Sequence, residues 1–337
     1  MTVYENFSLK PFNTFNIDAK AQYFAEVTAT GEIEQLLGQD KYRAGKILVL
    51  GGGSNVLFTG DFDGLVLKNS IKGIDLIKEE NGEYFLRAMS GEIWDDFVEY
   101  TVERELAGVE NLTLIPGTVG AAPIQNIGAY GTELKDTFYS LEALDLRDGR
   151  KITLNREECR FGYRDSIFKQ ELKGCAVITS VIFRMHKYTG PDFSYEGLRR
   201  EFEGSSTPVT IRNIRETVKK IRTAKLPDTA VLGNAGSFFK NPEISSDLFD
   251  ELKEKYPAMP GFKTASGSVK VPAGFLIEKA GFRGKRIGNA GSYANQALVV
   301  VNYGGASGKE ILQYGQLIQS EVMKMFGIEI HMEVNII

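Results

Sequence analysis

The arrangement of apolar and polar residues along the chain predicts a mixture of helices and short strands. Between residues 93 and 102, apolar side chains recur at helical spacing, and Gly108 follows the end of this helix. Residues 210–225 show the same spacing and end at a proline stop, Leu226-Pro227. Helices are also expected from about residue 32 to 37, after Ser166, and at 247–255, 273–280 and 309–326. Short apolar runs predict strands at 47–50, 65–67, 84–89, 141–147, 151–154, 175–185 and 297–302.

Turn and alternation patterns refine this picture. Asn81-Gly82 and Asp148-Gly149 each lie between predicted strands and indicate β-hairpins. Between residues 328 and 336 apolar and polar residues alternate, which predicts a half-buried final strand with Glu333 on its polar face. A chain of 337 residues is long for one hydrophobic core, so we expect two or three subdomains, with a boundary after Lys225.

Composition and charge exclude several classes of protein. The net charge of −4 is spread without a long basic block, which argues against nucleic acid or an anionic membrane as the main partner. The sequence has no apolar run of the ~20 residues needed to span a bilayer, and its first residues do not resemble a secretion signal. Two cysteines without metal-ligand spacing indicate a reduced, cytoplasmic protein.

Glycine is the one residue in excess, and it gathers in a few loops. The chain has 36 glycines, where an average near 7% gives about 24. Gly51-Gly52-Gly53-Ser54-Asn55 follows a predicted strand, and a second glycine-rich loop covers residues 115–131. Backbone amides in such loops form anion sites suited to a pyrophosphate. Either loop alone is explained by glycine turns, but two in one half of the chain favour a nucleotide cofactor. Neither a Rossmann nor a Walker A spacing is present.

Three side chains are candidates for chemistry, and each has a simpler explanation. Ser237, in the loop Gly233–Pro242, is either a turn serine bonded to its own backbone or a proton donor facing a pocket. Arg164 is either half of an ion pair with Asp165 or a fork that grips a carboxylate. Glu333 is by default an exposed carboxylate on an edge strand. With only two histidines, and no H-E-x-x-H, C-x-x-C or G-x-S-x-G motif, metal and triad chemistry is poorly supported, and we expect no metal.

An ordered set of motifs gives information about function that the spacing of single residues does not give. The chain resembles the UDP-N-acetylenolpyruvoylglucosamine reductases of peptidoglycan synthesis, of the longer, type I subfamily. The resemblance runs from end to end, and its order and spacing are specific. It differs at Thr229, where the family often has proline, and at Asn335, where many members have a basic residue. The motifs are Asn13-Thr14-Phe15, residues 51–55, 115–120 and 125–131, Tyr163-Arg164-Asp165-Ser166, Lys225-Leu226-Pro227, residues 233–242 and Glu333.

The resemblance implies an α+β fold, with an FAD-binding domain of the vanillyl-alcohol-oxidase type and a smaller α+β substrate-binding domain. The FAD-binding domain is expected as two subdomains, 1–69 and 70–225, the second with a substrate loop near 190–200. The substrate-binding domain is expected at 226–337, with the last strand returning to the active site. No histidine lies near the first glycine loop, so FAD is expected to bind noncovalently. The implied FAD-binding residues are Gly51, Gly52, Gly53, Ser54, Asn55, Ile115, Pro116, Gly117, Gly120, Ala121, Asn126, Gly128, Ala129, Tyr130 and Arg222.

The resemblance also implies the reaction. NADPH would reduce FAD, and the hydride would pass to C3 of the enolpyruvyl group of UDP-N-acetylglucosamine enolpyruvate, giving UDP-N-acetylmuramate. Arg164 would stabilise charge developing on the substrate carboxylate, and Glu333 would act with it there. Ser237 would give a proton to C2. The sequence has no local motif for the 2′-phosphate of NADPH, so this choice over NADH rests on the resemblance. Implied substrate contacts are Tyr163, Tyr195, Lys225, Asn241 and Gln296.

These expectations make the protein an FAD-dependent oxidoreductase with a UDP-sugar as its small-molecule partner, monomeric, and independent of nucleic acid and membranes. Two alternatives remain open at this point. One is an FAD oxidoreductase of the same fold with a different small substrate. The other is a flavin-free module that binds a nucleotide sugar.

Overall fold

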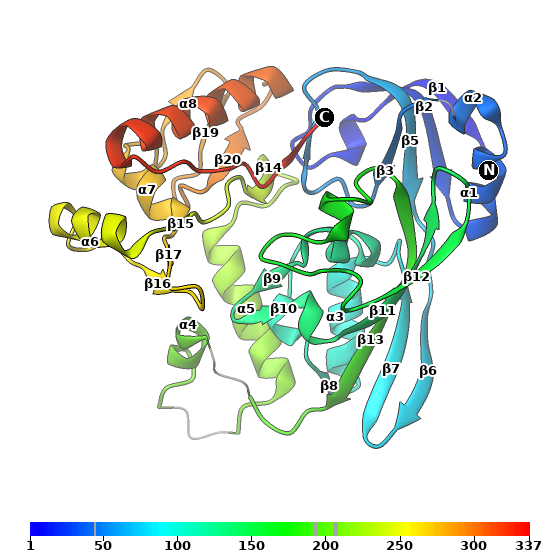
Figure 1. The fold of residues 1–337 in the computed structure, drawn as a ribbon, viewed down its shortest axis with the longest axis horizontal. Coiled ribbons are helices and arrows are strands. Elements are labelled where there is room, and N and C mark those ends of the chain that lie inside the picture. The colour runs from blue at the N-terminus through cyan, green and yellow to red at the C-terminus, as the bar shows by residue number, and fades with distance from the viewer. Residues whose placement is uncertain (44, 192–194, 205–207) are drawn as a thin grey trace. The chain divides into compact units, whose positions relative to one another are not determined.

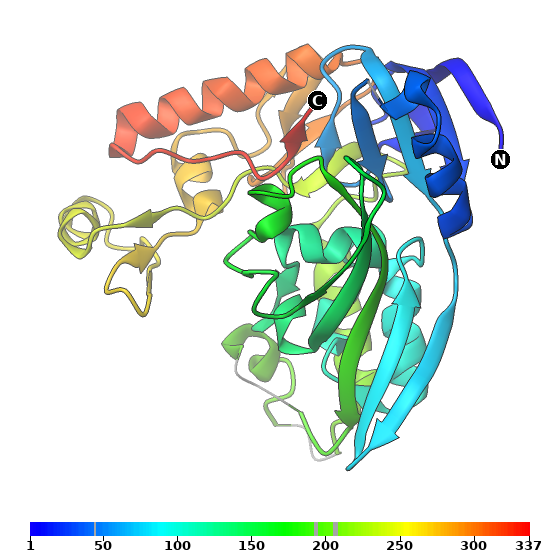
Figure 2. The same ribbon diagram turned by 45° about the vertical axis from the view of Figure 1, so that its right-hand side comes forward.

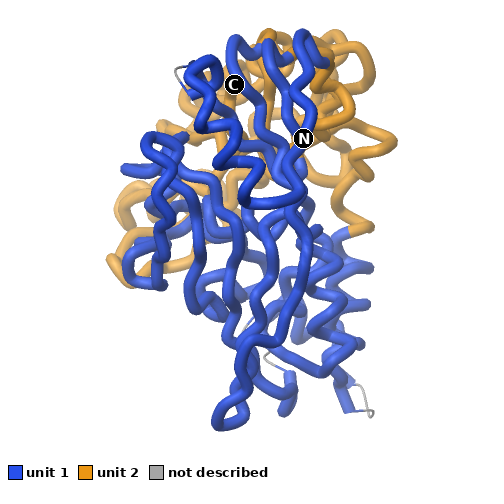
Figure 3. Tube along the Cα trace, turned by 90° about the vertical axis from the view of Figure 1, so that its right-hand side faces the viewer, with its two compact units in different colours: residues 1–7, 21–52, 62–222 blue, residues 8–20, 53–61, 223–337 orange. Residues whose placement is uncertain are grey.

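The computed structural model describes residues 1–43, 45–191, 195–204 and 208–337. By its internal contacts the chain forms two compact units, which Figure 3 shows in different colours. Unit 1 comprises residues 1–7, 21–52 and 62–222, and unit 2 comprises residues 8–20, 53–61 and 223–337. The chain thus passes from one unit to the other inside the first glycine loop, after Gly52. The division into 1–69, 70–225 and 226–337 stays a prediction.

The first sheet of unit 1 is formed around the predicted strands 47–50 and 65–67. Its strand order is β1-β2-β5-β3, and β5 pairs in parallel with both β2 and β3. Buried apolar residues such as Leu65 and Leu67 pack it against helix α1, whose inward face carries Ile33 and Leu36. The elements are β1 (Val3–Ser8), β2 (Lys20–Val27), β3 (Ile47–Leu50), β5 (Phe62–Asn69), α1 (Thr30–Leu37) and α2 (Asp40–Arg43).

The second sheet of unit 1 is antiparallel, with the order β12-β11-β13-β7-β6, and β8 also pairs with β13 (Figures 1 and 2). Both predicted hairpins are present. Asn81 and Gly82 have φ of 52° and 79°, the left-handed values that a tight turn between β6 and β7 requires. Strand β11 ends two residues earlier than predicted, at Asp145, because residues 146–148 already form the turn before β12. The strands are β6 (Ile74–Glu80), β7 (Glu83–Met89), β8 (Leu106–Ala107), β11 (Phe138–Asp145), β12 (Lys151–Asn155) and β13 (Ala176–Lys187).

Helix α3 (Trp94–Glu103) packs one face against this sheet, as its apolar spacing predicts. Trp94 and Phe97 are buried with Phe183 of β13, and the Trp94 indole N–H donates to the carbonyl of Leu112 at 2.9 Å. This bond satisfies the one polar group of a large buried side chain. Other elements of unit 1 are α4 (Glu196–Arg200), α5 (Ile211–Lys225, whose last turn enters unit 2), strands β9 (Gly128–Ala129) and β10 (Thr132–Glu133), and short 3-10 helices at Glu110–Leu112, Val119–Gln125, Leu134–Asp136 and Ile167–Lys169.

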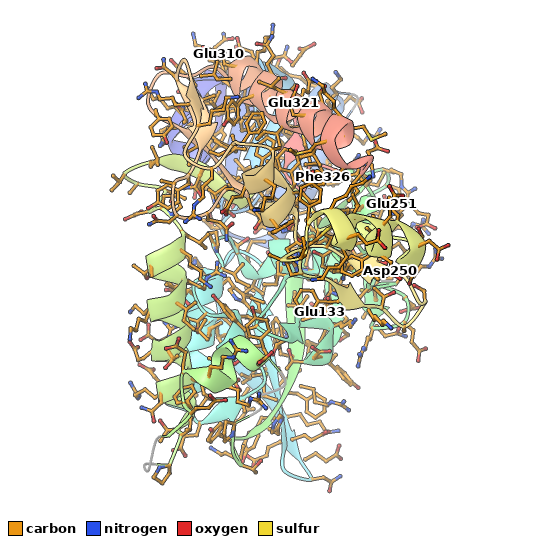
Figure 4. The ribbon with its side chains drawn as sticks, turned by 90° about the vertical axis from the view of Figure 1, so that its left-hand side faces the viewer. Glu133, Asp250, Glu251, Glu310, Glu321 and Phe326 are labelled. Atoms are coloured by element: carbon orange, nitrogen blue, oxygen red, sulfur yellow. The ribbon has the colours of Figure 1, made fainter. Side chains whose placement is uncertain are left out.

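Unit 2 combines small sheets with three helices predicted from the sequence. The long helix α8 (Gly308–Phe326) begins with a capping box, in which Ser307 and Glu310 exchange bonds, and it ends at Gly327 with φ of 67°. Figure 4 labels Glu310 and Phe326 toward its two ends; the Phe326 ring lies 5.0 Å from that of Tyr256, just after α6. The other elements are β4 (Val56–Leu57), β14 (Gly233–Ser237), β15 (Glu243–Ile244), α6 (Ser246–Lys255), β16 (Phe262–Lys263), β17 (Val269–Lys270), α7 (Ala273–Lys279), β18 (Arg286–Ile287), β19 (Ala290–Ser292), β20 (Val299–Asn302), β21 (Asn335–Ile336) and a 3-10 helix, Lys10–Phe12.

Two predictions for unit 2 were wrong. The segment containing Ser237 is not a loop: it is strand β14, antiparallel to β20, with an irregular register between Asn234 and Ser237. The predicted final strand at 328–336 is reduced to one bridge between Phe239 and Met332 and the short β21, which pairs in parallel with β4. Alternate residues, including Ile328 and Ile330, are nevertheless buried. An extended chain alternates its side chains whether or not it has ladder partners, so alternation alone could not separate these cases.

The described residues include no helix that is both long enough and apolar enough to cross a membrane.

The motif Asn13-Thr14-Phe15 folds around one buried side chain. Asn13 is 4% exposed. Its Nδ2 donates to the carbonyls of Leu9 and Ile17, and its Oδ1 accepts from the Ile17 N–H at 2.9 Å. A backbone turn whose polar groups are buried needs such partners.

We expect Asn13→Ala to lower the free energy of unfolding by ~2–3 kcal/mol, because three buried backbone groups would lose their partner. Denaturant titration followed by circular dichroism measures this change. Asp18→Ala, at an exposed position of the same segment, serves as the control and should change stability by less than ~0.5 kcal/mol. Equal stabilities for the two variants would contradict this assignment.

Candidate functional site

The two glycine loops meet inside unit 1. A Cβ atom on Gly52 would lie 2.9 Å from the Cα atom of Gly117, and one on Gly51 would lie 2.6 Å from Thr118 Oγ1. Only residues without a side chain allow so close an approach of two backbones. The methyl group of Ala121 lies 3.3 Å from the point that a Cβ atom on Gly51 would occupy. The start of the second loop thus lies against the end of β3.

Backbone hydrogen bonds hold the second loop against the segment between β7 and α3. The Gly120 N–H donates to the carbonyl of Ser90 at 2.9 Å, and the Trp94 N–H donates to the carbonyl of Gly117 at 3.1 Å. A Cβ atom on Gly120 would lie 2.5 Å from that of Ser90. Ile115 and Ala129 pack at the edge of the main core of unit 1. The loop is therefore a fixed part of the domain.

Arg164 is held in place by backbone geometry and by the second loop. Its φ of 53° lies in the left-handed region, which a side chain such as arginine rarely adopts. Its Nη2 donates to the carbonyl of Gly128 at 2.8 Å, and its guanidinium lies 5.5 Å from the ring centre of Tyr163. Asp165 accepts from the Ser166 N–H and from Gln170 Nε2.

Asn126 supports the same region. It is fully buried and has φ of 43°. Its Nδ2 donates to the carbonyl of Gly162 at 3.0 Å and to Glu133 Oε2, and its Oδ1 accepts from the Lys135 N–H. Its side chain therefore joins the glycine loop to the turn that presents Arg164.

Arg222 lies partly buried beside Tyr130. Its Nη2 donates to the carbonyl of Leu114 at 3.2 Å, and its guanidinium also hydrogen-bonds the Tyr130 hydroxyl. Burial lowers the pKa of Arg222 and raises that of Tyr130. The Arg222 Nε is buried and has no hydrogen-bond partner among the described residues. A buried donor without a partner is unfavourable, so a bound group with an acceptor would be stabilised here.

Tyr195 packs edge-on against Tyr130, with the ring centres 5.4 Å apart and the planes at 89°. It is 44% exposed and immediately precedes α4. The predicted substrate loop near 190–200 includes residues 192–194, which lie outside the described residues. Within unit 1, the structure thus brings Tyr195 next to the predicted FAD-binding residue Tyr130, which in turn bonds Arg222.

In unit 2, Thr14 joins the first glycine loop to the Ser237 strand. Its N–H donates to the carbonyl of Gly53 at 3.1 Å, and its carbonyl accepts from the Asn234 N–H at 3.0 Å. Gly53 has φ of 64°, and a Cβ atom there would lie 1.9 Å from the carbonyl oxygen of Phe12. This close approach explains why the motif Asn13-Thr14-Phe15 accompanies the glycine loop in sequence.

The irregular register of β14 brings Ser237 to the end of the strand. The buried Asn234 bonds the local backbone: its Oδ1 accepts from the Gly236 N–H, and its Nδ2 donates to the carbonyl of Leu232. The Ser237 hydroxyl takes part in none of the hydrogen bonds that the described residues make, so it is not a turn serine bonded to its own backbone. Sequence reasoning missed the role of Asn234, although an Asn two residues before a glycine is typical of such a turn.

The segment after Ser237 holds the segment that carries Glu333. The Glu333 N–H donates to the carbonyl of Phe238 at 2.8 Å, and the Lys240 N–H donates to the carbonyl of His331 at 2.9 Å. Glu333 is partly buried, unlike the exposed edge-strand carboxylate that is the default expectation. Asn55, from the first glycine loop, bonds the same C-terminal segment: its carbonyl accepts from both the N–H and the Nδ2 of Asn335.

The remaining predicted substrate contacts also lie in unit 2. Asn241 Oδ1 accepts from the Ala273 N–H at 2.9 Å, which fixes its amide at the start of α7. Gln296 lies in the turn before β20, where its own N–H donates to the carbonyl of Tyr293. The neighbouring Asn295 donates to the carbonyl of Ala224 at 3.5 Å, so the turn lies close to the exposed end of α5 that carries Lys225. Among the described residues, no group of three His, Cys, Asp or Glu side chains could hold a metal ion.

Comparison with known proteins shows similarity over the whole chain. Residues 21–155 match the family described as "FAD binding domain", and residues 227–337 match "UDP-N-acetylenolpyruvoylglucosamine reductase, C-terminal domain". A protein of Flavobacterium johnsoniae with the name UDP-N-acetylenolpyruvoylglucosamine reductase is 45% identical over 339 residues and covers 100% of both chains. One of the same name from Paraburkholderia phymatum is 46% identical, over 97% of this chain and 96% of that protein.

Solved structures support the fold. The crystal structure of UDP-N-acetylenolpyruvylglucosamine reductase from Thermus caldophilus has a TM-score of 0.70 at 21% identity, over 99% of this chain and 98% of that one. The 6-hydroxy-D-nicotine oxidase of Arthrobacter nicotinovorans has a TM-score of 0.50 at 14% identity, over 97% and 86% of the two chains. Together with the two family matches, these structures confirm the predicted fold class, an FAD-binding domain of the vanillyl-alcohol-oxidase type with a smaller substrate-binding domain.

The residues of unit 1 fit a bound FAD on structural grounds. The glycines of the two loops allow the backbone to approach a ligand closely, as a pyrophosphate site requires, and Arg222 Nε is a buried donor that lacks a partner among the described residues.

Gly52→Ala tests this fit. We expect the dissociation constant for FAD to rise by a factor between about 5 and about 100, since overpacking of this kind costs ~1–3 kcal/mol and ~1.4 kcal/mol is a factor of ten. Titration of the apoprotein with FAD, followed by flavin fluorescence, measures it. Gly31→Ala is the matched control, because nothing lies within 4 Å of its Cβ position. An unchanged affinity in Gly52→Ala would show that this contact does not shape the FAD site.

Proposed function

Because the chain belongs to the UDP-N-acetylenolpyruvoylglucosamine reductase family, we propose that it reduces UDP-N-acetylglucosamine enolpyruvate to UDP-N-acetylmuramate for peptidoglycan synthesis, with FAD as noncovalent cofactor and NADPH as hydride source. The observation that carries this proposal is the 45% identity over the full length of a relative with that name. The absence of histidine from residues 51–55 supports noncovalent binding.

Bound FAD supplies a carrier that accepts hydride from NADPH and delivers it to C3 of the enolpyruvyl group. The residues of this chain hold the reactants and manage charge and protons. The amides of the first glycine loop bind the FAD pyrophosphate, with Ser54 and Asn55 adding hydrogen bonds. The loop Ile115–Gly131 and Arg222 bind the rest of the cofactor.

Arg164 stabilises the negative charge that develops on the enolpyruvyl carboxylate as hydride adds. A guanidinium is always charged and binds a carboxylate through two parallel hydrogen bonds. Its strained backbone and its bond to Gly128 support this role, because a group that is already fixed need not reorganise during the reaction. Glu333 orients the substrate carboxylate together with Arg164.

Ser237 donates the proton that C2 receives. A hydroxyl is a weak acid, so it acts only when it is held within hydrogen-bond reach of the carbon. Two observations support this role: Ser237 lies at the end of a strand, and its hydroxyl has no hydrogen-bond partner among the described residues. Asn241, Gln296, Lys225, Tyr163 and Tyr195 bind the UDP-sugar, Lys225 as a compact positive charge for the diphosphate.

We further propose that the protein acts in the cytoplasm as a monomer that needs neither a membrane nor a nucleic acid. Cys159 and Cys175 are both free thiols, which supports a reducing compartment.

An anaerobic half-reaction experiment tests the proposed function. We expect NADPH to bleach the absorbance of the bound flavin, and UDP-N-acetylglucosamine enolpyruvate to restore it. A flavin that stays reduced with this substrate would indicate an FAD oxidoreductase with another substrate. A purified protein that neither contains nor binds flavin would indicate a flavin-free nucleotide-sugar module.

Ser237→Ala separates the two half-reactions. We expect flavin reduction by NADPH to stay near the wild-type rate, and reoxidation by the enolpyruvyl substrate to slow by about 10²–10⁴, the usual contribution of a positioned acid. Stopped-flow absorbance measures both rates. Ser266→Ala, in an exposed turn, is the control and should change neither. Equal losses in both halves would argue against proton donation by Ser237.

A further inference from the structure

Asp95 and Arg215 form an ion pair inside unit 1 to which the proposed reaction assigns no role. Arg215 Nη1 donates to Asp95 Oδ1 at 2.8 Å, and its Nη2 donates to Oδ2 at 3.1 Å. The Arg215 side chain is 6% exposed and that of Asp95 is 22% exposed. Glu99, on the more exposed side, lies 3.5 Å from Arg215 Nη2. A bidentate pair that joins α3 to α5 can be explained by its contribution to fold stability alone, so a role in the FAD site needs separate evidence.

That evidence is a third hydrogen bond to the Asp95 carboxylate. The Leu114 N–H donates to Asp95 Oδ1 at 2.6 Å, and Arg215 Nη1 also donates to the hydroxyl of the preceding residue, Thr113, at 3.3 Å. Burial by itself raises the pKa of Asp95, but the bonds from Arg215 and Leu114 outweigh it and keep that pKa below its ordinary value. The carboxylate is therefore charged at neutral pH, when its bonds are strongest.

Leu114 is a residue that needs such support. Its φ of 56° is left-handed, a conformation that is unfavourable for an L-residue with a side chain. It immediately precedes Ile115-Pro116-Gly117, the start of the second glycine loop. Its conformation therefore sets the direction in which that loop leaves the helix at Glu110–Leu112.

The other side of Leu114 bonds Arg222. The Leu114 carbonyl accepts from Arg222 Nη2 at 3.2 Å, while Arg222 Nε is buried without a partner among the described residues. Arg215 and Arg222 are seven residues apart on α5, two helical turns, and so share one face. Helix α5 thus presents two arginines to the segment around Leu114. Arg215 fixes this segment through Asp95, and the Leu114 carbonyl in turn fixes Arg222.

We propose that Asp95 and Arg215 are positioning residues of the FAD site, which hold Leu114 in its left-handed conformation and through it place both the second glycine loop and Arg222. This inference rests on the proposed function, because it takes FAD as the group that the loop and Arg222 bind. Neither residue touches the cofactor in this account: their effect passes through the peptide groups of Leu114.

Asp95→Asn tests the proposal through FAD affinity. The side chain keeps its shape, but it loses its charge and directs an amide N–H₂ toward one of its former donors. We expect the FAD dissociation constant of the apoprotein to rise about tenfold or more, with an altered absorbance spectrum of the bound flavin.

The chain offers a matched control in Asp145→Asn. Asp145 is a buried aspartate of the same unit, 2% exposed, which also accepts from an arginine side chain and from a backbone N–H, both of Arg147. It has no bond to the glycine loops. We expect both variants to be less stable in denaturant titrations, and only Asp95→Asn to lose FAD affinity. Equal loss of affinity in both variants, or loss in neither, would overturn the proposal.

A rescue experiment tests the role of Leu114. Glycine adopts left-handed φ without the penalty of a side chain, so Leu114→Gly in the Asp95→Asn background should recover part of the lost affinity. No recovery would show that Asp95 does not act through the conformation of Leu114. If Asp95→Asn does not fold, Arg215→Lys with Arg147→Lys as control takes its place, because lysine keeps the charge and loses the bidentate geometry. A wild-type protein that binds no FAD would reject the proposed function, whereas a wild type that binds FAD and an Asp95→Asn variant of unchanged affinity would reject only this inference.

Discussion

The candidate site depends on backbone segments that approach one another more closely than any side chain permits. In unit 1, Gly52 lies against Gly117 with no room for a Cβ atom. In unit 2, Gly53 lies against the carbonyl of Phe12, and Gly233 against that of Phe15. Adding a single carbon atom at any of these places would push two loops apart. Glycine at such places also lets the backbone approach a phosphate closely, which is the property that a phosphate-binding loop needs.

Hydrogen bonds from backbone to backbone then connect the segments that carry the chemistry. Thr14 bonds the first glycine loop on one side and β14 on the other, and the residues after Ser237 bond those around Glu333. Because main-chain groups form each link, the link fixes where a segment lies and does not depend on which side chains the segment carries. Ser237 and Glu333, nearly a hundred residues apart in sequence, are thus parts of one hydrogen-bonded assembly in unit 2.

Charged groups with little exposure to solvent are the second feature that organises the candidate site. Arg222 is partly buried, and Tyr130 and the Leu114 carbonyl satisfy only some of its donors among the described residues. Burying a guanidinium is unfavourable unless its donors are used, so such a residue is retained where a ligand completes its bonds. The charges of Asp95 and Arg215, in contrast, are paired with each other. We therefore assign cofactor binding to Arg222, and positioning of the Leu114 segment to Asp95 and Arg215.

The sequence by itself determined the longer helices, the hairpins, the family and the identity of the candidate residues. Helical spacing identified α3, α5 and α8 because a buried face must repeat every 3.6 residues, and Asn81-Gly82 identified a turn because few residues adopt its angles. Only the tertiary structure decided that Ser237 ends a strand, that residues 328–336 are extended and form one bridge and the short β21, and that Asn234, Asp95 and Leu114 bond segments next to the candidate residues. Those outcomes depend on hydrogen bonds between residues far apart in sequence, and periodicity and local motifs carry no information about such partners.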